Sequence, residues 1–473
     1  MTVPLTVANL CRAPRELPVP FNLEVRISFA DGATAAGQVE CTDVLRHLPG
    51  SRLVVRVVAA GGTYALKLFL GREAQRHYRR ELAGLAALSG SQSGAARAAA
   101  TLEMDDGAER AWGVLVPWIE GAEPLRDDDV AGVREVAAQV GRLHAQSYLR
   151  SDPHLNNYVR GSDGMIHALD GDGVRLCRWP LPGRYLANLG RQLAELPPAA
   201  DRDMAQVCQA YCRARWGRDA TPSLLARVRS HLRRQRRRRV RRFLAKTLRE
   251  CSEFHCERAS GSFVACARDA WRTEMQAFVV DPEVAFSGAE VIKSGNSATV
   301  ARATLDGRPV VIKRYNVKSC WHGVRRSMRR LPRYRRAWCN GHRMVFLGLR
   351  TPRALALLEH RMGLFKTVAY LVMEDGGSRS LDVVVAEQGT SGSLVNGVVE
   401  VLAGLRESGL VHGDTKASNF LLADGQICLI DLDAMTEGVH HERDLKRFLA
   451  NWDALPEARA RFADALQAAG MGL

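Results

Sequence analysis

The sequence predicts an α+β fold built as two consecutive modules, residues 1–245 and 246–473. The chain of 473 residues is too long for one ordinary hydrophobic core and suits two domains of roughly 200–250 residues. Each half has a strand-like run with a single lysine, followed later by Asp-x4-Asn and then by another aspartate. These positions are Lys67, Asp152, Asn157 and Asp170 in the first half, and Lys313, Asp414, Asn419 and Asp431 in the second. The internal repeat indicates one fold used twice.

The composition is that of a soluble globular protein, with 46% hydrophobic and 25% charged residues. The eleven cysteines are scattered without a disulfide framework, which predicts free thiols in a reducing cytoplasm. The net charge of +16 is concentrated in an arginine run at 233–242 and in a stretch at 318–343 that has no acidic residue. Such runs attract polyanions, although the first one also fits a solvated helix face. Aromatic residues are only 6% and no nucleic-acid-binding motif is present, so no nucleic-acid partner is expected.

Lysine is scarce, with eight lysines among the 67 basic residues. A lysine that remains is therefore expected where a compact, rotatable ammonium is needed. Lys67 lies in the strand-like run YALKLF, and Lys313 ends the run VVIK. A lone lysine in a strand is otherwise an edge residue that reaches toward solvent, so its role depends on the rest of the motif.

The segment 412–422 reads HGDTKASNFLL and carries the most specific motif of the chain. It follows a helical apolar pattern at 398–405 and precedes a short hairpin that ends in Asp431 and Asp433. His-Gly-Asp-x4-Asn with a following aspartate resembles the catalytic loop and metal-binding aspartate of the protein-kinase superfamily. Phosphoryl transfer needs a carboxylate beside the attacking hydroxyl and ligands for the metal that neutralises the phosphates.

The resemblance implies ATP and Mg²⁺ as cofactors and a small β-rich lobe followed by a larger helical lobe in each module. It also implies a role for each motif residue: Asp414 as catalytic base, Lys416 at the γ-phosphate, Lys313 at the α- and β-phosphates, and Asn419, Asp431 and Asp433 at the metal. Gly295 and Ser297, in a turn between two strand-like runs, are expected to cover the phosphates. Glu374 follows an apolar strand and is expected where the interlobe hinge meets adenine.

One departure from protein kinases narrows the resemblance. No acidic residue lies between Asp306 and Glu359, so the helix partner that usually pairs with the strand lysine is absent. An aromatic-centred helix at 335–342 instead leads into the turn GLRTP at 348–352. This pattern resembles the lipopolysaccharide core (heptose) kinases of Gram-negative bacteria, over most of residues 287–449.

That family resemblance implies the acceptor and the location. The acceptor would be a sugar hydroxyl of the lipopolysaccharide inner core, a heptose, or of another anionic glycolipid. The enzyme would work in the cytoplasm, peripherally associated with the anionic surface of the inner membrane.

The first half repeats the design with weaker motifs. Glu81 lies fourteen residues after Lys67 on a helix-like segment and is expected as its ion-pair partner. Asp152 takes the base position, and Asn157 and Asp170 take the metal positions.

Three positions of the first half depart from the second. Arg150 and Ser151 replace the His-Gly pair, and His154 stands where the second half has Lys416. The first half is therefore either a second active site or a pseudokinase that supports the second half.

Two rival functions remain open for the whole chain. A Ser/Thr protein kinase is disfavoured because no Ala-Pro-Glu segment follows Asp431, and residues 435–444 leave little platform for a peptide. A non-catalytic scaffold is disfavoured for the second half by its complete motif, and it stays open for the first.

Overall fold

The computed structural model describes residues 5–29, 32–59, 61–91, 97–107, 109–126, 128–295, 297–316, 331–362, 366–377 and 379–472. The predicted phosphate-covering turn therefore has one member, Asn296, outside the described residues, and the predicted basic stretch from Lys318 lies outside them as far as residue 330. The chain divides into two compact units, one of residues 1–196 and 202–236 and the other of residues 197–201 and 237–473. The division falls inside helix α6 (Pro222–Lys246), whereas the predicted boundary at residue 245 is next to the end of that helix.

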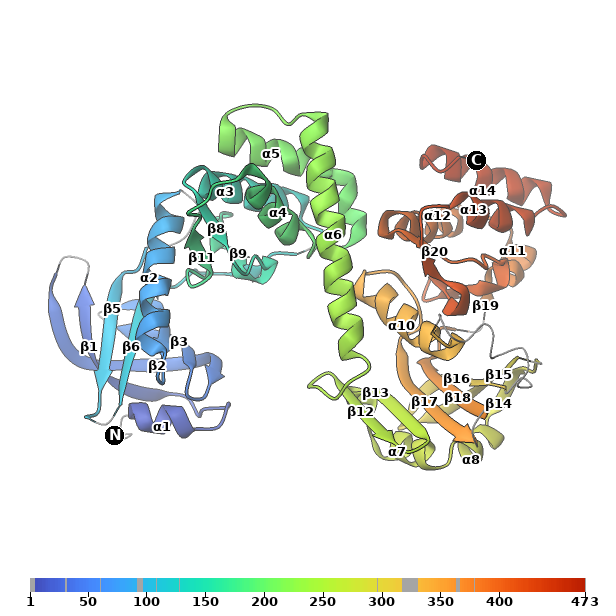
Figure 1. Cartoon of the computed structure of the whole chain (residues 1–473), viewed down its shortest axis with the longest axis horizontal. Coiled ribbons are helices and arrows are strands. Elements are labelled where there is room, and N and C mark those ends of the chain that lie inside the picture. Colours follow the sequence, from blue (N-terminus) through green and yellow to red (C-terminus); the bar gives the residue numbers. More distant parts are fainter. Residues whose placement is uncertain are drawn as a thin grey trace. The chain divides into compact units, whose positions relative to one another are not determined.

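The first unit begins with a closed antiparallel barrel of strand order β1-β2-β3-β4-β6-β5, with α2 beside it (Figure 1). Its elements are α1 (Val7–Arg12), β1 (Phe21–Phe29), β2 (Thr34–Leu48), β3 (Arg52–Ala59), β4 (Gly62–Phe69), α2 (Ala74–Gly90), β5 (Ala100–Asp105) and β6 (Arg110–Pro117). In β3 every second side chain points inward, and Leu53, Val55 and Val57 are fully buried. This alternation follows from the two-residue period of a strand and fills the barrel with apolar side chains.

The remainder of the first unit is mainly helical, with two small sheets of order β10-β9-β7 and β11-β8. Its elements are β7 (Glu123–Pro124), α3 (Val130–Ala145), β8 (Tyr148–Arg150), a 3₁₀ turn (Leu155–Asn157), β9 (Tyr158–Arg160), β10 (Ile166–Ala168), β11 (Val174–Leu176), α4 (Pro182–Leu193), a 3₁₀ turn (Pro198–Asp203), α5 (Met204–Trp216) and α6.

The second unit begins with a seven-stranded antiparallel sheet of order β12-β13-β17-β18-β16-β15-β14. Its elements are β12 (Phe254–Ala259), β13 (Ser262–Ala267), a 3₁₀ turn (Arg268–Ala270), α7 (Thr273–Val280), α8 (Pro282–Ser287), β14 (Glu290–Lys293), β15 (Ala298–Leu305), β16 (Arg308–Tyr315), α10 (Arg333–Phe346), β17 (Ala354–Met362) and β18 (Lys366–Glu374). Helix α10 packs on this sheet through the fully buried Trp338.

The helical part of the second unit carries the loop motif. Its elements are β19 (Arg379–Ser380), α11 (Leu381–Gln388), α12 (Gly392–Ser408), β20 (Leu410–Val411), a 3₁₀ turn (Ala417–Asn419), β21 (Phe420–Ala423), β22 (Gln426–Leu429), a 3₁₀ turn (Leu432–Ala434), β23 (Thr436–Glu437), α13 (Glu442–Ala450) and α14 (Pro456–Ala468). Helix α12 begins at a capping serine, Ser391, whose hydroxyl accepts from the Leu394 N–H, and it ends at Gly409 with φ of 67°. The motif thus follows directly after a well-terminated helix.

None of the helices in the described part of the chain combines the length and hydropathy needed to cross a bilayer.

Candidate active site

The lysine of the second unit lies on an inner strand of the sheet. Lys313 is on β16 and pairs with Val300 on β15 and with Leu371 on β18. Its side chain is only 11% exposed, and its Nζ lies 2.8 Å from Asp431 Oδ1 and 3.1 Å from Asp433 Oδ2. These two ion pairs join the sheet to the segment that follows the β21–β22 hairpin. The structure therefore brings together three of the predicted site residues.

Asp431 begins the short turn after β22 in the left-handed conformation, with φ of 57°. Burial on its own raises the pKa of Asp431, but the charge and hydrogen bond of Lys313 outweigh it and hold that pKa below its usual value. Asp431 is therefore ionised at neutral pH.

Asp433 is more deeply buried than Asp431, with 4% of the residue exposed. It accepts a hydrogen bond from the Tyr315 hydroxyl at 2.8 Å and from Arg333 at 2.9 Å, in addition to the ion pair with Lys313. Tyr315 and Lys313 share β16, whereas Arg333 begins α10. Lys313, which has no acidic partner on the neighbouring helix, thus pairs with a carboxylate from the turn after the hairpin.

An aspartate of α13 fixes the backbone of the loop motif by hydrogen bonds. Asp444 accepts hydrogen bonds from the backbone N–H groups of His412, at 2.6 Å, and Gly413, at 2.9 Å. The backbone carbonyl of Asp444 accepts from the Thr415 hydroxyl at 2.6 Å. His412 is fully buried and donates through Nε2 to the Ile430 carbonyl at 3.0 Å, which fixes the loop against the residue before Asp431.

Asp414 and Asn419 are tied to each other through the loop backbone. Asn419 donates from Nδ2 to the Asp414 carbonyl at 2.8 Å, and the Asn419 carbonyl accepts from the Ile430 N–H at 2.9 Å. The Asp414 side chain is a quarter exposed, and two cations flank it: Arg447 on α13 at 2.6 Å and Lys416 at 3.7 Å. A carboxylate accessible from solvent thus lies beside two positive charges.

The remaining predicted residues of this unit lie on the sheet. Asn316, just beyond β16, donates from Nδ2 to the Gly295 carbonyl at 2.8 Å, and its N–H donates to the Ser297 carbonyl at 3.2 Å. This ties the predicted turn to the end of the lysine strand. Glu374 ends β18 and pairs with Val310 of β16. Among the described residues, no side-chain hydrogen bond or ion pair connects Gly295, Ser297 or Glu374 with the two aspartates that bind Lys313.

The oxygen atoms of this site suit a divalent cation. One carboxylate oxygen of Asp431 binds Lys313, and no hydrogen bond or ion pair from the described residues engages the other. Asn419 uses its Nδ2 for the loop, which leaves its amide oxygen as an acceptor. Mg²⁺ prefers hard oxygen ligands of these kinds. No group of three His, Cys, Asp or Glu residues suited to a metal occurs in the described part of the chain.

The first unit holds a comparable arrangement. Lys67 on β4 lies 2.7 Å from Glu81 Oε1 on α2 and 3.3 Å from Asp170 Oδ1, and it donates to the Leu169 carbonyl at 2.8 Å. Glu81 is fully buried, and this burial raises its pKa. Burial also tends to raise the pKa of Asp170, but Lys67 outweighs it and lowers that pKa to about 2.

The loop of the first unit differs at its acidic residue. Asn157 donates to the Asp152 carbonyl at 3.2 Å, as Asn419 does to Asp414 in the second unit. His154 lies between two carboxylates, 2.8 Å from Asp152 and 2.7 Å from Glu195. The Asp152 side chain is 69% exposed, far more than that of Asp414.

Some site residues have no clear signal in the sequence. Asp444, Arg447, Tyr315 and Arg333 all contact motif residues, but they lie at distances along the chain that no short motif spans. The absence of an acidic residue between 306 and 359 was the one available indication that Lys313 needed another partner.

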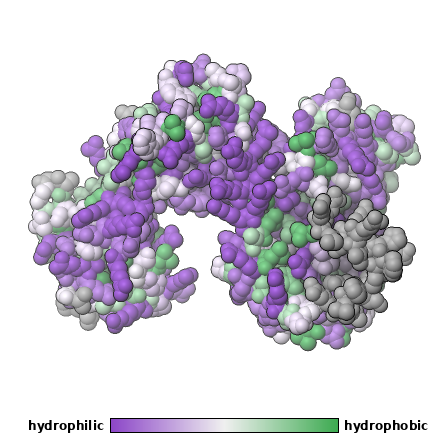
Figure 2. All heavy atoms as spheres, in the orientation of Figure 1, coloured by the Kyte–Doolittle hydropathy of each residue, from purple (hydrophilic) through white to green (hydrophobic). Residues whose placement is uncertain are grey.

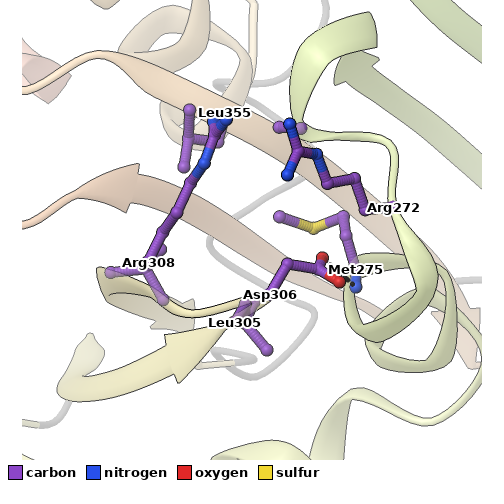
Figure 3. A pocket seen from close by; sticks show the side chains of 8 residues that line it. Arg272, Met275, Leu305, Asp306, Arg308 and Leu355 are labelled. Carbon is purple, nitrogen blue, oxygen red and sulfur yellow. Dashed lines mark hydrogen bonds between the residues drawn. The ribbon is translucent and has the colours of Figure 1, made fainter.

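A small cavity of about 10 Å³ lies elsewhere in the second unit, and its volume is enough for about one water molecule (Figure 3). Arg272, Met275, Asp306, Arg308 and Leu355 are among the residues that line it. Asp306 accepts hydrogen bonds from the N–H groups of Glu274 and Met275 in the first turn of α7. The cavity includes none of the predicted site residues.

Comparison with known proteins identifies the second unit. Residues 283–451 match the sequence model of the lipopolysaccharide kinase (Kdo/WaaP) family. Residues 283–451 are therefore those of a kinase similar to this family. The match contains all the site residues of that unit described above, and it confirms the resemblance inferred from the sequence.

Two further comparisons add less to this kinase assignment. A search of curated proteins found no match. The crystal structure of a Toxoplasma gondii specific rhoptry antigen kinase domain is similar at 10% identity and a TM-score of 0.28, over 44% of this chain and 78% of that one. At that TM-score the similarity supports no argument about this kinase.

Proposed function

We propose that the second unit transfers the γ-phosphate of ATP to a sugar hydroxyl of the lipopolysaccharide inner core, a heptose. The observation that carries the proposal is the ion pair between Lys313 and Asp431, which joins the lysine strand to the turn beside the loop motif. The kinase family of residues 283–451 supports lipopolysaccharide as the substrate class.

Asp414 acts as the general base in this proposal. The acceptor hydroxyl gives its proton to the Asp414 carboxylate as its oxygen bonds to the γ-phosphorus, and the bond from that phosphorus to the β-phosphate oxygen breaks to release ADP. Arg447 and Lys416 flank Asp414 and supply positive charge where negative charge develops on the transferred group.

Lys313 would bind the α- and β-phosphates, and Asn419 and Asp431 would hold Mg²⁺, which would neutralise phosphate charge. The turn with Gly295 and Ser297 covers the phosphates, and Glu374 lies at the adenine side of the cleft.

The first unit is proposed to be a second module of the same superfamily. The buried ion pair between Lys67 and Glu81 supports a nucleotide site there. In an active module Asp152 would be the base, with Asn157 and Asp170 at the metal. A pseudokinase that supports the second unit is the second candidate, favoured by His154, which binds the Asp152 carboxylate.

We place the chain in the cytoplasm, peripherally on the anionic inner membrane, where the lipopolysaccharide core is also anionic. Helix α6 supports this placement because it has no acidic residue and carries the exposed arginines Arg227, Arg233, Arg234, Arg237, Arg238, Arg241 and Arg242. The surface over α6 is mainly hydrophilic (Figure 2). An anionic bilayer attracts basic surfaces of this kind.

A Ser/Thr protein kinase is the alternative for the second unit. From Asp431 the chain reaches α13 at Glu442 through one 3₁₀ turn and the two-residue strand β23. This short path offers little surface for an extended peptide, which favours the sugar acceptor.

Transfer of label from ATP to purified, dephosphorylated lipopolysaccharide core tests the proposal. The wild type should label the core, and Asp414→Asn should reduce the rate by at least about a hundredfold. Asp453→Asn, which changes an exposed aspartate that forms an ion pair with Arg459, is the matched control and should keep full activity. Asp152→Asn then reports whether the first unit is a second enzyme.

Labelling of protein in place of core would favour the protein kinase. ATP hydrolysis without any labelled core would refute the proposed acceptor.

A further inference from the structure

The first unit carries an unusual group of exposed apolar side chains. Leu176 is 61% exposed, Trp179 73% and Leu181 64%, all within six residues. They lie in residues 176–184, which we name the docking loop. Scattered single apolar residues are normal on a protein surface, but adjacent large ones mark a contact site.

The docking loop is held in place at both of its ends. The buried Cys177 donates its N–H to the Ser147 carbonyl at 2.7 Å. Further along, the Leu181 N–H donates to the Trp179 carbonyl at 2.8 Å and the Arg184 N–H to the Leu181 carbonyl at 2.9 Å, where α4 begins. The backbone is therefore fixed by hydrogen bonds while the apolar side chains remain in solvent.

The charged residues within 173–194 are all positive. Arg178 and Arg184 are exposed members of the loop, and no acidic residue occurs anywhere in residues 173–194. A second exposed apolar group, Val280 at 84% and Val284 at 68%, differs in this respect because Asp281 and Glu283 lie between them. Of these two groups, the docking loop is the one that combines apolar side chains with charge that complements an anionic surface.

We propose that the docking loop binds the surface of a bilayer that contains anionic phospholipids. Trp179 lies at the headgroup level, where amphipathic aromatic rings are favoured, and Leu176 and Leu181 enter the boundary of the acyl chains. Arg178 and Arg184 bind lipid phosphates. The inference names the surface for the membrane contact of the proposed function, but it needs none of that function's chemistry.

Sedimentation of the full chain with vesicles tests the docking loop without ATP or lipopolysaccharide, so its outcome is separate from that of the phosphate-transfer assay. Vesicles of about three parts phosphatidylcholine to one part phosphatidylglycerol should bind the wild type. Trp179→Ser with Leu181→Ser should raise the lipid concentration for half-maximal binding by at least about tenfold. Val280→Ser with Val284→Ser is the matched control and should bind as the wild type does.

The arginines are tested in the same assay. Arg178→Gln with Arg184→Gln should weaken binding to the anionic vesicles by several-fold, and added salt should reduce the difference from wild type. The exposed Arg15 and Arg249 lie outside the loop, so the pair Arg15→Gln and Arg249→Gln controls for the loss of two charges.

Three results would overturn the inference: no binding of the wild type to the anionic vesicles, equal binding by the Trp179 and Leu181 variant, or an equal loss in the Val280 and Val284 control. A wild type that self-associates through the loop, with the loop variant monomeric and still bound to lipid, would also overturn it. Because Trp179 and Leu181 are exposed, their replacement is not expected to unfold the chain, and an unchanged thermal unfolding temperature verifies this.

Discussion

Replacement of Tyr315 by phenylalanine separates two roles for Asp433, which the motif alone assigned to the metal. The Tyr315 hydroxyl is 2.8 Å from Asp433 Oδ1 and both residues are buried, so the substitution removes one of the three contacts that fix this carboxylate. If Asp433 orients Lys313 instead of binding Mg²⁺, the loss of this hydroxyl should weaken phosphate binding by Lys313 even though the metal site is untouched.

The magnitude follows from the contacts. A hydrogen bond from a neutral donor to a buried carboxylate contributes about 1.5 kcal/mol, and Lys313 keeps its 2.8 Å ion pair with Asp431. We therefore expect kcat/KM for MgATP to fall by about tenfold in Tyr315→Phe, mainly through KM. Asp433→Asn removes a charge that faces Lys313 and Arg333, and it should cost about a hundredfold.

Steady-state kinetics at varied ATP and varied Mg²⁺ make the distinction. Both variants should leave the Mg²⁺ concentration for half-maximal rate unchanged. Tyr370→Phe is the control, because it also removes a hydroxyl bound to a carboxylate, that of Glu283, on the neighbouring strand away from Lys313. A raised Mg²⁺ requirement in Asp433→Asn together with normal ATP kinetics in Tyr315→Phe would refute the positioning role.

Three further predictions concern stability. His342 is buried among aromatic rings and burial lowers its pKa to about 3, so the unfolded chain takes up a proton near pH 6.5 before the folded chain does. The contribution of His342 to stability should be constant above pH 6.5 and fall by about 1.4 kcal/mol per pH unit below it, so His342→Phe should reduce the slope of stability against pH there by that amount; an unchanged slope would contradict the assignment. Asp444→Asn should lower the free energy of unfolding by about 2 kcal/mol, because the loop loses a charged acceptor, and it should lower kcat by a larger factor than it raises the KM for ATP. Equal changes in kcat and in the KM for ATP would argue against this. Lys67→Met should destabilise the first unit by about 3 kcal/mol in thermal unfolding, since it leaves the buried Glu81 carboxylate without its cationic partner, and adding Glu81→Gln should restore most of the loss.

The local elements of the site could be predicted from the sequence, because they depend on short-range patterns. The apolar pattern at 398–405 lies within α12, and the hairpin before Asp431 forms β21 and β22. The helix-like segment with Glu81 is α2. The repeated spacing also singled out lysines and aspartates that prove to be joined by ion pairs, 118 residues apart in the second unit.

The arrangement of the strands could not be predicted in the same way. The closed barrel of the first unit and the seven-stranded sheet of the second depend on pairings between distant strands, such as β1 with β5 and β13 with β17. The contacts of Asp444 and Arg447 with the loop depend on how α13 packs beneath it. The hydrophobic periodicity of α13 or of the loop does not indicate which of their residues come into contact.

The two units hold the strand lysine with different contributions from the neighbouring helix. In the first unit α2 supplies the acid Glu81 to Lys67, and the second aspartate of the turn, Asp172, is bound by arginines, Arg52 at 3.2 Å and Arg80 at 3.0 Å. The corresponding aspartate in the second unit turns to the lysine, and α10 supplies the cation Arg333 in place of an acid.

In both cases the strand lysine, the helix and the turn after the hairpin are joined through one cluster of charges. A helix without an acidic residue therefore does not indicate a lost site when the turn provides a second buried aspartate and the helix provides a base to hold it. In the sequence, this arrangement is indicated by a helix that has a basic but no acidic residue together with a second aspartate in the turn. A test for it is the double variant in which Arg333 and Asp433 are exchanged for uncharged residues together, which should lose less stability than the single Asp433→Asn variant because no charge remains unpaired.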